Sequence, residues 1–522
     1  MGNLILYFFW LSSLPLLVYG VARVFYSIWW KPKWLEWQIK QQGVAGNCYK
    51  LLVGDMKELI KLISEAWSKP IHLNHKIVQR VDPFTLKNVQ KYGNISLCWN
   101  GTSPRMIIKD PELMKEVLSN KEGHFQKPPL NALILILARG LTSLEGEKWA
   151  KHRRILNPAF HLEKLKVMIP EFLTSSSNMI EQWKKMVGDE GSSELDIWPE
   201  FQKLTADAIS RVAFGSNYEQ GKRIFQLQKE LLQLTIEAMQ TVYIPGYRFV
   251  PMKKNRRRKE LDREITTMLR NIIQGKENAM KTGESRVDDL LGILLQCNNQ
   301  NILQDNSSST TITGMTIEEV IEECKVFYIA GQETTSSLLT WAMIVLAMHL
   351  DWQEKARQEV LQICQKIEPN FEAITHLKTV TMILYEVLRL YPPVIAEYQH
   401  TNQKTNLGEI YLPAGVDITL PTLLIHHDPE LWGDDADEFK PERFSQGIAK
   451  ASKGQGQSAF FPFGWGPRTC IGQNFAMLEA KVALAMILQN FSFQLSPSYS
   501  HAPYTVTTLQ PQHGAQIILH KL

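Results

Sequence analysis

The chain has 522 residues, of which 44% are hydrophobic and 21% are charged, with a net charge of +4 at pH 7. This apolar content excludes a disordered chain, because it suffices to build a large core. The weak positive charge gives no support to nucleic-acid binding, which needs a strongly basic face. The six cysteines form no CxxC pair and show no zinc-like spacing with histidine, so we expect reduced thiols in a cytosol-facing protein.

The N-terminal stretch differs from the rest of the sequence in its apolar character. Residues 4–22 contain no charged side chain, and after Arg23 the apolar run continues up to Lys31. A helix needs about 20 apolar residues to cross a bilayer. Positive charge lies only on the C-terminal side, which predicts a cytosolic main body. We therefore predict a transmembrane anchor over 1–30 and a juxtamembrane hinge over 31–45, with a cleaved signal peptide as the alternative.

A β-hairpin is predicted over residues 94–110. Hydrophobic residues alternate from Ile95 to Trp99, and the dipeptide Asn100-Gly101 is typical of a tight turn. Helical hydrophobic spacing then dominates the sequence. It occupies residues 146–157, 162–187 and 200–214.

Two polar segments, 188–194 and 299–315, are predicted to be loops. After about residue 400, short strands alternate with turns, so the pattern predicts a mainly α fold with a small β portion. Six basic residues gather between Lys253 and Lys259. We interpret them as the solvated start of a helix, and contact with anionic lipid headgroups is the alternative.

The most specific pattern is the run from Phe463 to Gly472. It places Cys470 on a glycine-rich loop directly before a helical pattern over 473–491. The macrodipole and free N–H groups at a helix start favour a thiolate. Arg468 can pair with a carboxylate on whatever the sulfur binds. The alternative is a buried cysteine beside a turn.

The spacing Phe-x-x-Gly-x-Arg-x-Cys-x-Gly in this run resembles the haem-binding loop of the cytochrome P450 superfamily. The resemblance implies that Cys470 is the axial thiolate ligand of the iron in haem b. It also implies that Arg468 and Phe463 belong to the cofactor-binding residues.

A second motif lies in a long predicted helix that begins at the capping box Thr316–Glu319. Gly331 costs about 1 kcal/mol there relative to alanine, which hints at a function such as opening space for a flat ligand. The Thr334 hydroxyl can bond to a carbonyl one turn earlier, and a local bulge would hold water. An ordinary helix with a small-residue packing face is the alternative. The segment resembles the oxygen-activating helix of the superfamily, in which Glu333 and Thr334 would deliver protons as catalytic residues.

Two further motifs resemble structural elements of the same superfamily. Glu386 and Arg389 share one helix face, and with Arg443 they resemble the triad that locks the core around the haem loop. Trp149 and Arg153 lie one helical turn apart and offer only donors, which suits a haem propionate. The alternatives are a chance surface pair and an amphipathic helix with a basic face.

One departure from the superfamily concerns the propionates. Gln399-His400 stands where many members carry an arginine. Haem anchoring is then expected to depend on Trp149, Arg153 and Arg468.

The motifs occur in the family's order, and the resemblance covers roughly residues 30–522. Several details resemble the plant microsomal clan that contains secologanin synthase and triterpenoid or steroid oxidases. The resemblance implies a cytochrome P450 fold with an N-terminal transmembrane anchor and a haem-thiolate monooxygenase domain over 46–522. It implies oxidation of a lipophilic isoprenoid (a triterpenoid, steroid or iridoid) in plant specialised metabolism. Electrons would come from NADPH through a separate NADPH–cytochrome P450 reductase at the endoplasmic reticulum membrane, with the catalytic domain in the cytosol.

Three alternatives stay open. The first is a reductase-independent haem isomerase or dehydratase that acts on hydroperoxides. The second is an oxidase of a plant hormone, and the third is a membrane protein that binds haem without catalysis. By family analogy the substrate pocket would be lined by five largely apolar segments: 130–141, 243–249, 327–335, 394–398 and 505–509.

Overall fold

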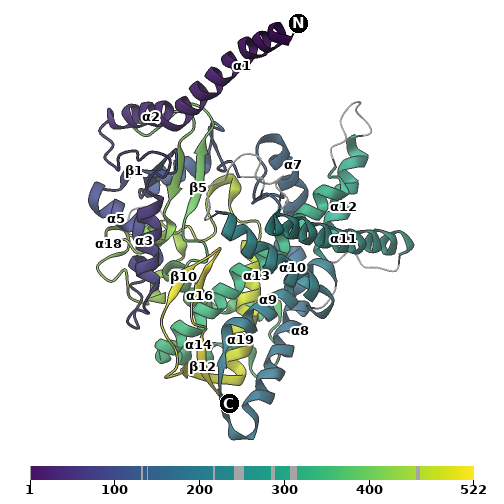
Figure 1. Cartoon of the computed structure of the whole chain (residues 1–522). Coiled ribbons are helices and arrows are strands. Elements are labelled where there is room, and N and C mark those ends of the chain that lie inside the picture. The colour runs from purple at the N-terminus through teal and green to yellow at the C-terminus, as the bar shows by residue number, and fades with distance from the viewer. Residues whose placement is uncertain are drawn as a thin grey trace. The chain divides into compact units, whose positions relative to one another are not determined.

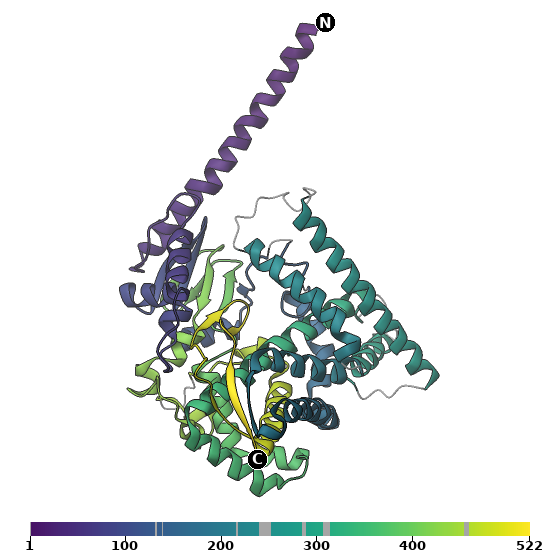
Figure 2. The same cartoon turned by 60° about the horizontal axis from the view of Figure 1, so that its bottom comes forward.

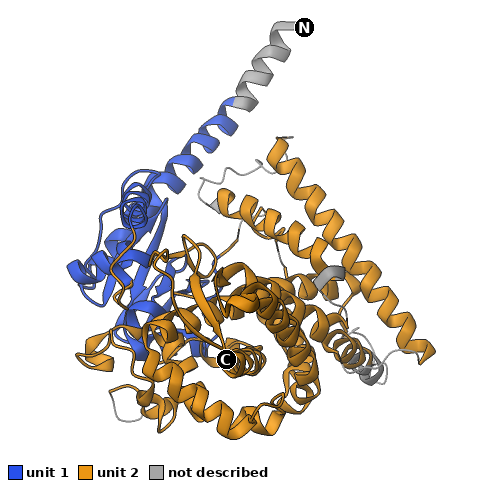
Figure 3. Ribbon diagram, turned by 90° about the horizontal axis from the view of Figure 1, so that it is seen from below, with its two compact units in different colours: residues 1–69, 78–128, 396–425 blue, residues 70–77, 129–395, 426–522 orange. Residues whose placement is uncertain are grey.

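The computed structural model describes the chain except for residues 1, 131–132, 138, 216–217, 240–251, 284–288, 306–313 and 454–458, and it gives only the backbone of 2–13, 218–220, 239 and 300–305. The described chain forms two compact units, which Figure 3 colours separately. Unit 1 comprises residues 1–69, 78–128 and 396–425, and unit 2 comprises 70–77, 129–395 and 426–522.

Unit 1 contains a five-stranded mixed sheet with the strand order β1-β2-β8-β5-β3. Its strands are β1 (Ile95–Asn100), β2 (Ser103–Ile108), β3 (Phe125–Gln126), β5 (Glu397–Thr401) and β8 (Asp417–Leu420). The predicted hairpin is confirmed, because β1 and β2 pair in antiparallel with Asn100 opposite Ser103. Gly101 connects them at φ +60°, a conformation that favours glycine. A small hairpin adds β6 (Thr405–Leu407) and β7 (Ile410–Leu412).

The helices of unit 1 lie before, between and after these strands along the chain. They are α1 (Gly2–Phe25), the π-helical turn Tyr26–Trp30, α2 (Lys31–Lys40), α3 (Met56–Trp67), α4 (Val78–Val81), α5 (Pro83–Tyr92) and α6 (Pro111–Ser119), with α17 (Thr422–His426) at the unit boundary. Most of the predicted hinge forms α2, whose Leu35 and Ile39 are buried. The helices, as far as the chain is described, do not combine the length and apolar composition that a bilayer crossing requires.

Unit 2 carries most of the helices. They are α7 (Gly146–Leu156), α8 (Leu162–Val187), α9 (Ile197–Phe214), α10 (Tyr218–Met239), α11 (Lys253–Thr282), α12 (Leu290–Asp305), α13 (Ile317–Met348), α14 (Leu350–Cys364), α15 (Phe371–His376), α16 (Lys378–Leu390), α18 (Pro429–Trp432) and α19 (Gln473–Asn490). Short 3-10 turns cover Asn157–Phe160, Gly188–Glu190, Pro441–Phe444, Ile448–Lys450 and Gly466–Arg468. The predicted helices over 146–157, 162–187 and 200–214 correspond to α7, α8 and α9, and the basic cluster begins α11.

The strands of unit 2 correct one loop prediction. β4 (Ser192–Asp196) and β9 (Phe491–Leu495) pair with β12 (Gln516–Lys521) between them, and β10 (Pro503–Thr505) pairs with β11 (Leu509–Pro511). Residues 188–194 therefore do not form a simple loop. Their partner strand lies at the far end of the chain, and local polarity cannot show such a pairing.

The second loop prediction is also wrong in part, because α12 continues to Asp305. The start of this helix is buried on all sides, through Leu290, Leu291, Ile293, Leu294 and Leu295. At Asn298 the side chain bonds the backbone of Met315 in both directions, at 3.0 and 2.5 Å. Tertiary contacts of this kind outweigh the low helix propensity of asparagine.

Helix α13 is the centre of the helical part of unit 2. It packs against α9, α11, α16 and α19, and Figures 1 and 2 show it among them from two directions. The predicted capping box is confirmed, since Glu319 N–H donates to the Thr316 hydroxyl at 3.2 Å and Thr316 N–H donates to the Glu319 carboxylate at 3.0 Å. From Thr335 to Ala347 every residue of α13 is buried. This helix therefore gives unit 2 a rigid core element on which a site can be built.

Candidate functional site

The cysteine loop, from Phe463 to Gly472, closes on itself through its backbone. The N–H of Cys470 donates to the carbonyl of Phe463 at 2.8 Å. Gly464 and Gly466 both adopt φ +72°, which L side chains rarely tolerate. The glycines therefore let the chain turn tightly enough to bring the two ends of the loop together.

Cys470 lies three residues before α19, which begins at Gln473 with Gly472 as its N-cap. The Cys470 side chain is exposed. A Cβ added to Gly472 would lie 3.9 Å from the Cys470 sulfur, an ordinary contact distance, so Gly472 directly neighbours the sulfur. The helix start places N–H groups and the positive end of a macrodipole near the thiol, which favours the thiolate.

The three predicted cofactor donors converge on this loop. The guanidinium of Arg468 lies over the Trp149 ring, and Arg153 Nη1 donates to the carbonyl of Thr469 at 2.9 Å. Arg468 also donates to the carbonyl of Leu144 at 2.8 Å. Burial lowers the pKa of Arg153, and the negative charge of Cys470 opposes this with a smaller raising contribution. Two guanidinium groups thus lie at the cysteine loop, and that of Arg468 is paired with the Glu145 carboxylate.

This donor set fits a haem. A single exposed thiol at a helix start can ligate iron, and two guanidinium groups with an indole N–H offer donors to carboxylates. The chemistry and the arrangement of these residues therefore agree with the cofactor that the sequence resemblance implies.

The acid–threonine pair lies on α13. Thr334 donates to the carbonyl of Ala330 at 2.7 Å, as predicted from its position in a helix. Glu333 accepts from Gln510 Nε2 at 3.2 Å, and burial raises the pKa of Glu333 against a smaller lowering contribution from Lys229. The segment stays α-helical, so the predicted bulge is not formed. The hydroxyl instead satisfies the carbonyl without interrupting the helix.

Gly331 lies where α9 packs against α13. A Cβ at this position would meet the side chain of Ile209 on α9 at 3.1 Å. The glycine therefore permits close packing of α9 on α13, which agrees with the small-residue packing face given above as the alternative.

The predicted triad is assembled in the core of unit 2. Arg389 forms two bonds to the Glu386 carboxylate, at 2.8 and 2.7 Å, and both side chains are 0% exposed. Arg443 Nε lies 3.5 Å from the same carboxylate. Buried charges of this kind need several partners. Arg389 accordingly also donates to the carbonyls of His426, Ala436 and Glu438.

His426 is a residue that sequence reasoning missed. Its carbonyl accepts from Arg389 at 2.8 Å, and its Nε2 accepts the N–H of Phe461 at 2.9 Å. Burial lowers the pKa of His426 well below its ordinary value, so the neutral ring can accept this bond. The histidine thereby joins the triad to Phe461, in the segment that leads into the cysteine loop. No spacing in the sequence signals this role.

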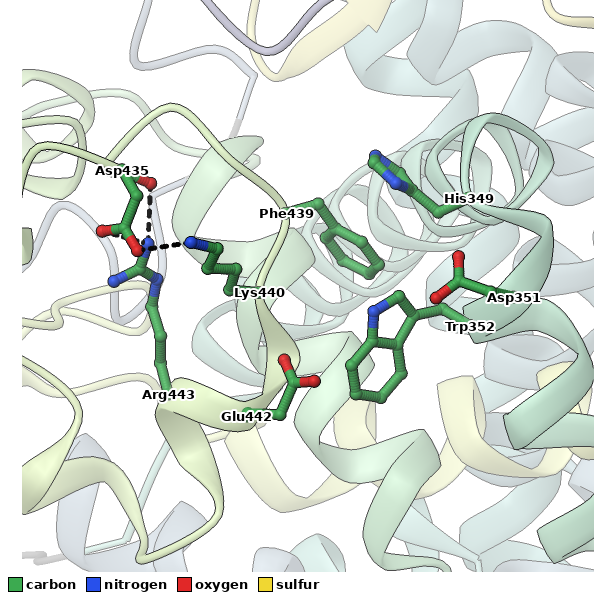
Figure 4. A pocket seen from close by; sticks show the side chains of 8 residues that line it. All are labelled: His349, Asp351, Trp352, Asp435, Phe439, Lys440, Glu442 and Arg443. Atoms are coloured by element: carbon green, nitrogen blue, oxygen red, sulfur yellow. Dashed lines mark hydrogen bonds and ion pairs between the residues drawn. The ribbon is translucent and has the colours of Figure 1, made fainter.

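An open cavity of about 630 Å³ lies next to the triad. Figure 4 shows its lining, which consists of His349, Asp351, Trp352, Asp435, Phe439, Lys440, Glu442 and Arg443. Asp435 pairs with Arg443 at 2.7 Å and with Lys440 at 2.8 Å. The hydrogen bond from Lys440 is the main cause that lowers the pKa of Asp435 to about 2. The cavity includes neither Cys470 nor Glu333, so it is separate from the residues of the predicted chemistry.

The remaining predicted positions are distributed as follows. His400 belongs to unit 1, where its Nδ1 lies 2.8 Å from Asp417 Oδ1. Residues 327–335 form part of α13, and 505–509 lead from β10 to β11. The segment 243–249 lies outside the described residues.

Comparisons with known proteins bear on the same residues. The Cytochrome P450 family pattern matches residues 68–519. Cytochrome P450 CYP72A616 of Paris polyphylla is 56% identical over 496 residues, which are 95% of either chain. The 11-oxo-beta-amyrin 30-oxidase of Glycyrrhiza uralensis is 51% identical over 98% of this chain and 97% of its own length. The 7-deoxyloganic acid hydroxylase of Catharanthus roseus is 49% identical over 98% of each.

A solved structure supports the fold. The retinoic acid-bound cyanobacterial CYP120A1 superposes with a TM-score of 0.74 at 21% identity, over 92% of this chain and 99% of that one. The predicted mainly α fold with small sheets is thus confirmed. Together with the family match over most of the sequence, these findings give one conclusion. The chain belongs to the cytochrome P450 family of haem-containing monooxygenases.

Proposed function

We propose that this monooxygenase hydroxylates or oxidises a lipophilic isoprenoid (a triterpenoid, steroid or iridoid) in plant specialised metabolism. The convergence of Trp149, Arg153 and Arg468 on the loop of Cys470 is the observation that supports the catalytic part. Two relatives named for a triterpenoid and an iridoid acid, each matched over 98% of this chain, support the substrate class.

In this proposal Cys470 ligates the haem iron, and Trp149, Arg153 and Arg468 hold the propionates, while Phe463 closes the cysteine loop through its carbonyl. When bound, the haem supplies the activation of dioxygen for insertion into a C–H bond. The protein places this sulfur beside a helix start and two guanidinium groups, an environment that favours the thiolate.

Glu333 and Thr334 act as the proton route. Burial raises the pKa of Glu333, so this acid retains a proton to higher pH than an exposed glutamate does. The neighbouring hydroxyl of Thr334 is held on the Ala330 carbonyl at 2.7 Å and can both accept and donate a proton. We assign the two groups to one proton route because both can exchange protons and both lie on the same turn of α13.

Electrons come from NADPH through a separate NADPH–cytochrome P450 reductase. The basic residues Lys151 and Arg154 on α7 suit an acidic partner by charge complementarity. The apolar residues 4–22 anchor the chain in the endoplasmic reticulum membrane, with the catalytic part in the cytosol. Anchor and reductase would then share one membrane.

A reductase-coupled assay tests this function. The full chain is expressed with a plant reductase and supplied with triterpenoids, steroids and iridoids. Oxygenated product that depends on NADPH is the expected result. Turnover of hydroperoxides without reductase would instead identify an isomerase or dehydratase. Bound haem without turnover of any substrate would indicate a non-catalytic haem protein. Oxidation of a plant hormone alone would show that the substrate is a hormone and not an isoprenoid of specialised metabolism.

A further inference from the structure

A buried hydrogen-bonded pair of side chains joins α7 to α13. His152 Nδ1 lies 2.6 Å from Glu323 Oε1, and the two side chains are 1% and 0% exposed. The other oxygen of Glu323 accepts the backbone N–H of Leu141 at 3.0 Å. A carboxylate without solvent is costly unless both of its oxygens are bonded, and here each has a partner. Glu323 therefore joins two helices and one loop at a single carboxylate.

The loop approaches α13 closely at this point. The carboxylate of Glu322 accepts the N–H of Arg139 at 2.9 Å, so two successive glutamates bind backbone groups of one loop. Gly140 lies between these donors. A Cβ there would come within 2.6 Å of Glu323 Oε2 and 2.9 Å of the Val326 side chain. A residue larger than glycine would push the loop away from the carboxylate.

The same loop leads to the cysteine loop. The carbonyl of Gly140 accepts from the N–H of Ser143 at 2.9 Å and from that of Leu144 at 3.2 Å, which makes a compact turn. The carbonyl of Leu144 then accepts from Arg468 Nη2 at 2.8 Å, and the carboxylate of Glu145 pairs with the same guanidinium. An unbroken series of bonds thus connects α13 to the arginine beside Cys470.

We propose that Glu323 is a positioning residue for Arg468. By binding His152 and Leu141 together, its carboxylate fixes the segment 139–145, and this segment fixes the guanidinium. An arginine side chain loses conformational entropy when a ligand holds it in one rotamer. Acceptors that already fix the Arg468 guanidinium reduce the entropy that is lost when a haem propionate binds. The inference depends on the proposed role of Arg468 as a haem-propionate donor.

Hydrogen exchange of the haem-loaded full chain, followed by mass spectrometry of peptic fragments, tests the proposal. Glu323→Gln replaces one of the two acceptor oxygens by an amide nitrogen, so the side chain can no longer accept from both His152 and Leu141. We expect fragments covering 139–145 and 463–472 to exchange about tenfold faster, equivalent to about 1.4 kcal/mol of lost protection. Haem transfer to apomyoglobin should accelerate in the same variant. Glu318→Gln is the matched control, because Glu318 lies on the same helix, is exposed and pairs with Arg270 at 2.9 Å.

Unchanged exchange of 139–145 in Glu323→Gln would overturn the proposal, and so would faster exchange there without any change in 463–472. A general increase over all fragments would also count against it, because it would indicate a purely structural role. Gly140→Ala provides a second variant that leaves Glu323 and His152 unchanged in sequence but crowds the loop against the carboxylate, and it should give the same local pattern. These readouts are independent of substrate turnover, so they separate failure of this inference from failure of the proposed function.

Discussion

The guanidinium carbon of Arg468 lies 4.6 Å from the centre of the Trp149 ring. Trp149 belongs to α7 and Arg468 to the cysteine loop, so this contact joins two segments that are far apart in the sequence. Arg153, one turn after Trp149, bonds the carbonyl directly before Cys470. The one-turn spacing of Trp149 and Arg153 thus places both side chains on the face of α7 that contacts the loop.

Replacement of the proposed ligand gives the first prediction. Cys470→Ala should abolish the thiolate-type absorbance band of the reduced carbon monoxide complex, because no sulfur remains at the start of α19. The measurement is a difference spectrum of the purified protein. Cys48→Ala is the control, since Cys48 is also exposed but contacts Lys40 in unit 1. A normal band in Cys470→Ala would remove the ligand assignment.

The second prediction concerns Thr334. Thr334→Ala should raise the hydrogen peroxide released per NADPH consumed severalfold, because a hydroxyl that passes protons is lost. Peroxide and NADPH are measured in the reductase-coupled assay. Thr174→Ala is the matched control, because Thr174 on α8 makes the same bond to a carbonyl one turn earlier, at 2.8 Å. Equal coupling in Thr334→Ala and wild type would argue against the proton route.

The buried triad gives the third prediction. Arg389→Ala leaves the Glu386 carboxylate buried without its bidentate partner, which typically costs about 3–5 kcal/mol of the free energy of unfolding. Urea denaturation followed by tryptophan fluorescence measures this loss. Arg257→Ala removes an exposed pair with Glu230 and should cost far less. Similar losses in the two variants would show that burial of the pair is not what matters.

A fourth prediction follows from Glu479 on α19. Burial raises its pKa well above the ordinary value, against a smaller lowering contribution from Thr335. The pKa of Glu479 is higher in the folded chain than in the unfolded chain, where it is about 4.3. Folding therefore takes up a proton at pH values between these two pKa values. The contribution of Glu479 to the free energy of unfolding is complete below about pH 4.3 and is lost as pH rises through the pKa of the folded state.

Glu479→Gln should therefore flatten the dependence of unfolding free energy on pH in this range, since the amide cannot ionise. Urea denaturation at a series of pH values measures the slope. Glu163→Gln, at an exposed position on α8, should keep the wild-type slope. An unchanged slope in Glu479→Gln would mean that other groups produce it.

The fifth prediction concerns the N-terminus. Tyr49 donates its hydroxyl to the carbonyl of Ile28 at 2.5 Å, so a deletion that is meant to spare the fold should end before this residue. Deletion of residues 2–25 should shift the protein from the membrane to the soluble fraction with its haem retained. Fractionation and haem quantification measure both. Retention in the membrane would contradict the proposed anchor, and loss of haem would make the segment part of the fold.

The sequence by itself determined the features that depend on local spacing. The capping box at Thr316, the back-bond of Thr334 and the shared face of Glu386 and Arg389 follow from the 3.6-residue period of a helix. The place of Cys470 directly before a helix was equally readable, because glycines and a following apolar period mark such a loop.

Tertiary structure decided the features whose partners lie far along the chain. β4 is a strand because it pairs with β12, and Gly331 lies against Ile209 of a distant helix. The carboxylate of Glu323 contacts His152 and accepts from Leu141 N–H. Local pattern specifies which face of an element is apolar, but it does not specify which distant segment covers that face. The choice among possible partners is made only when the whole chain packs and each buried polar group must find its bond.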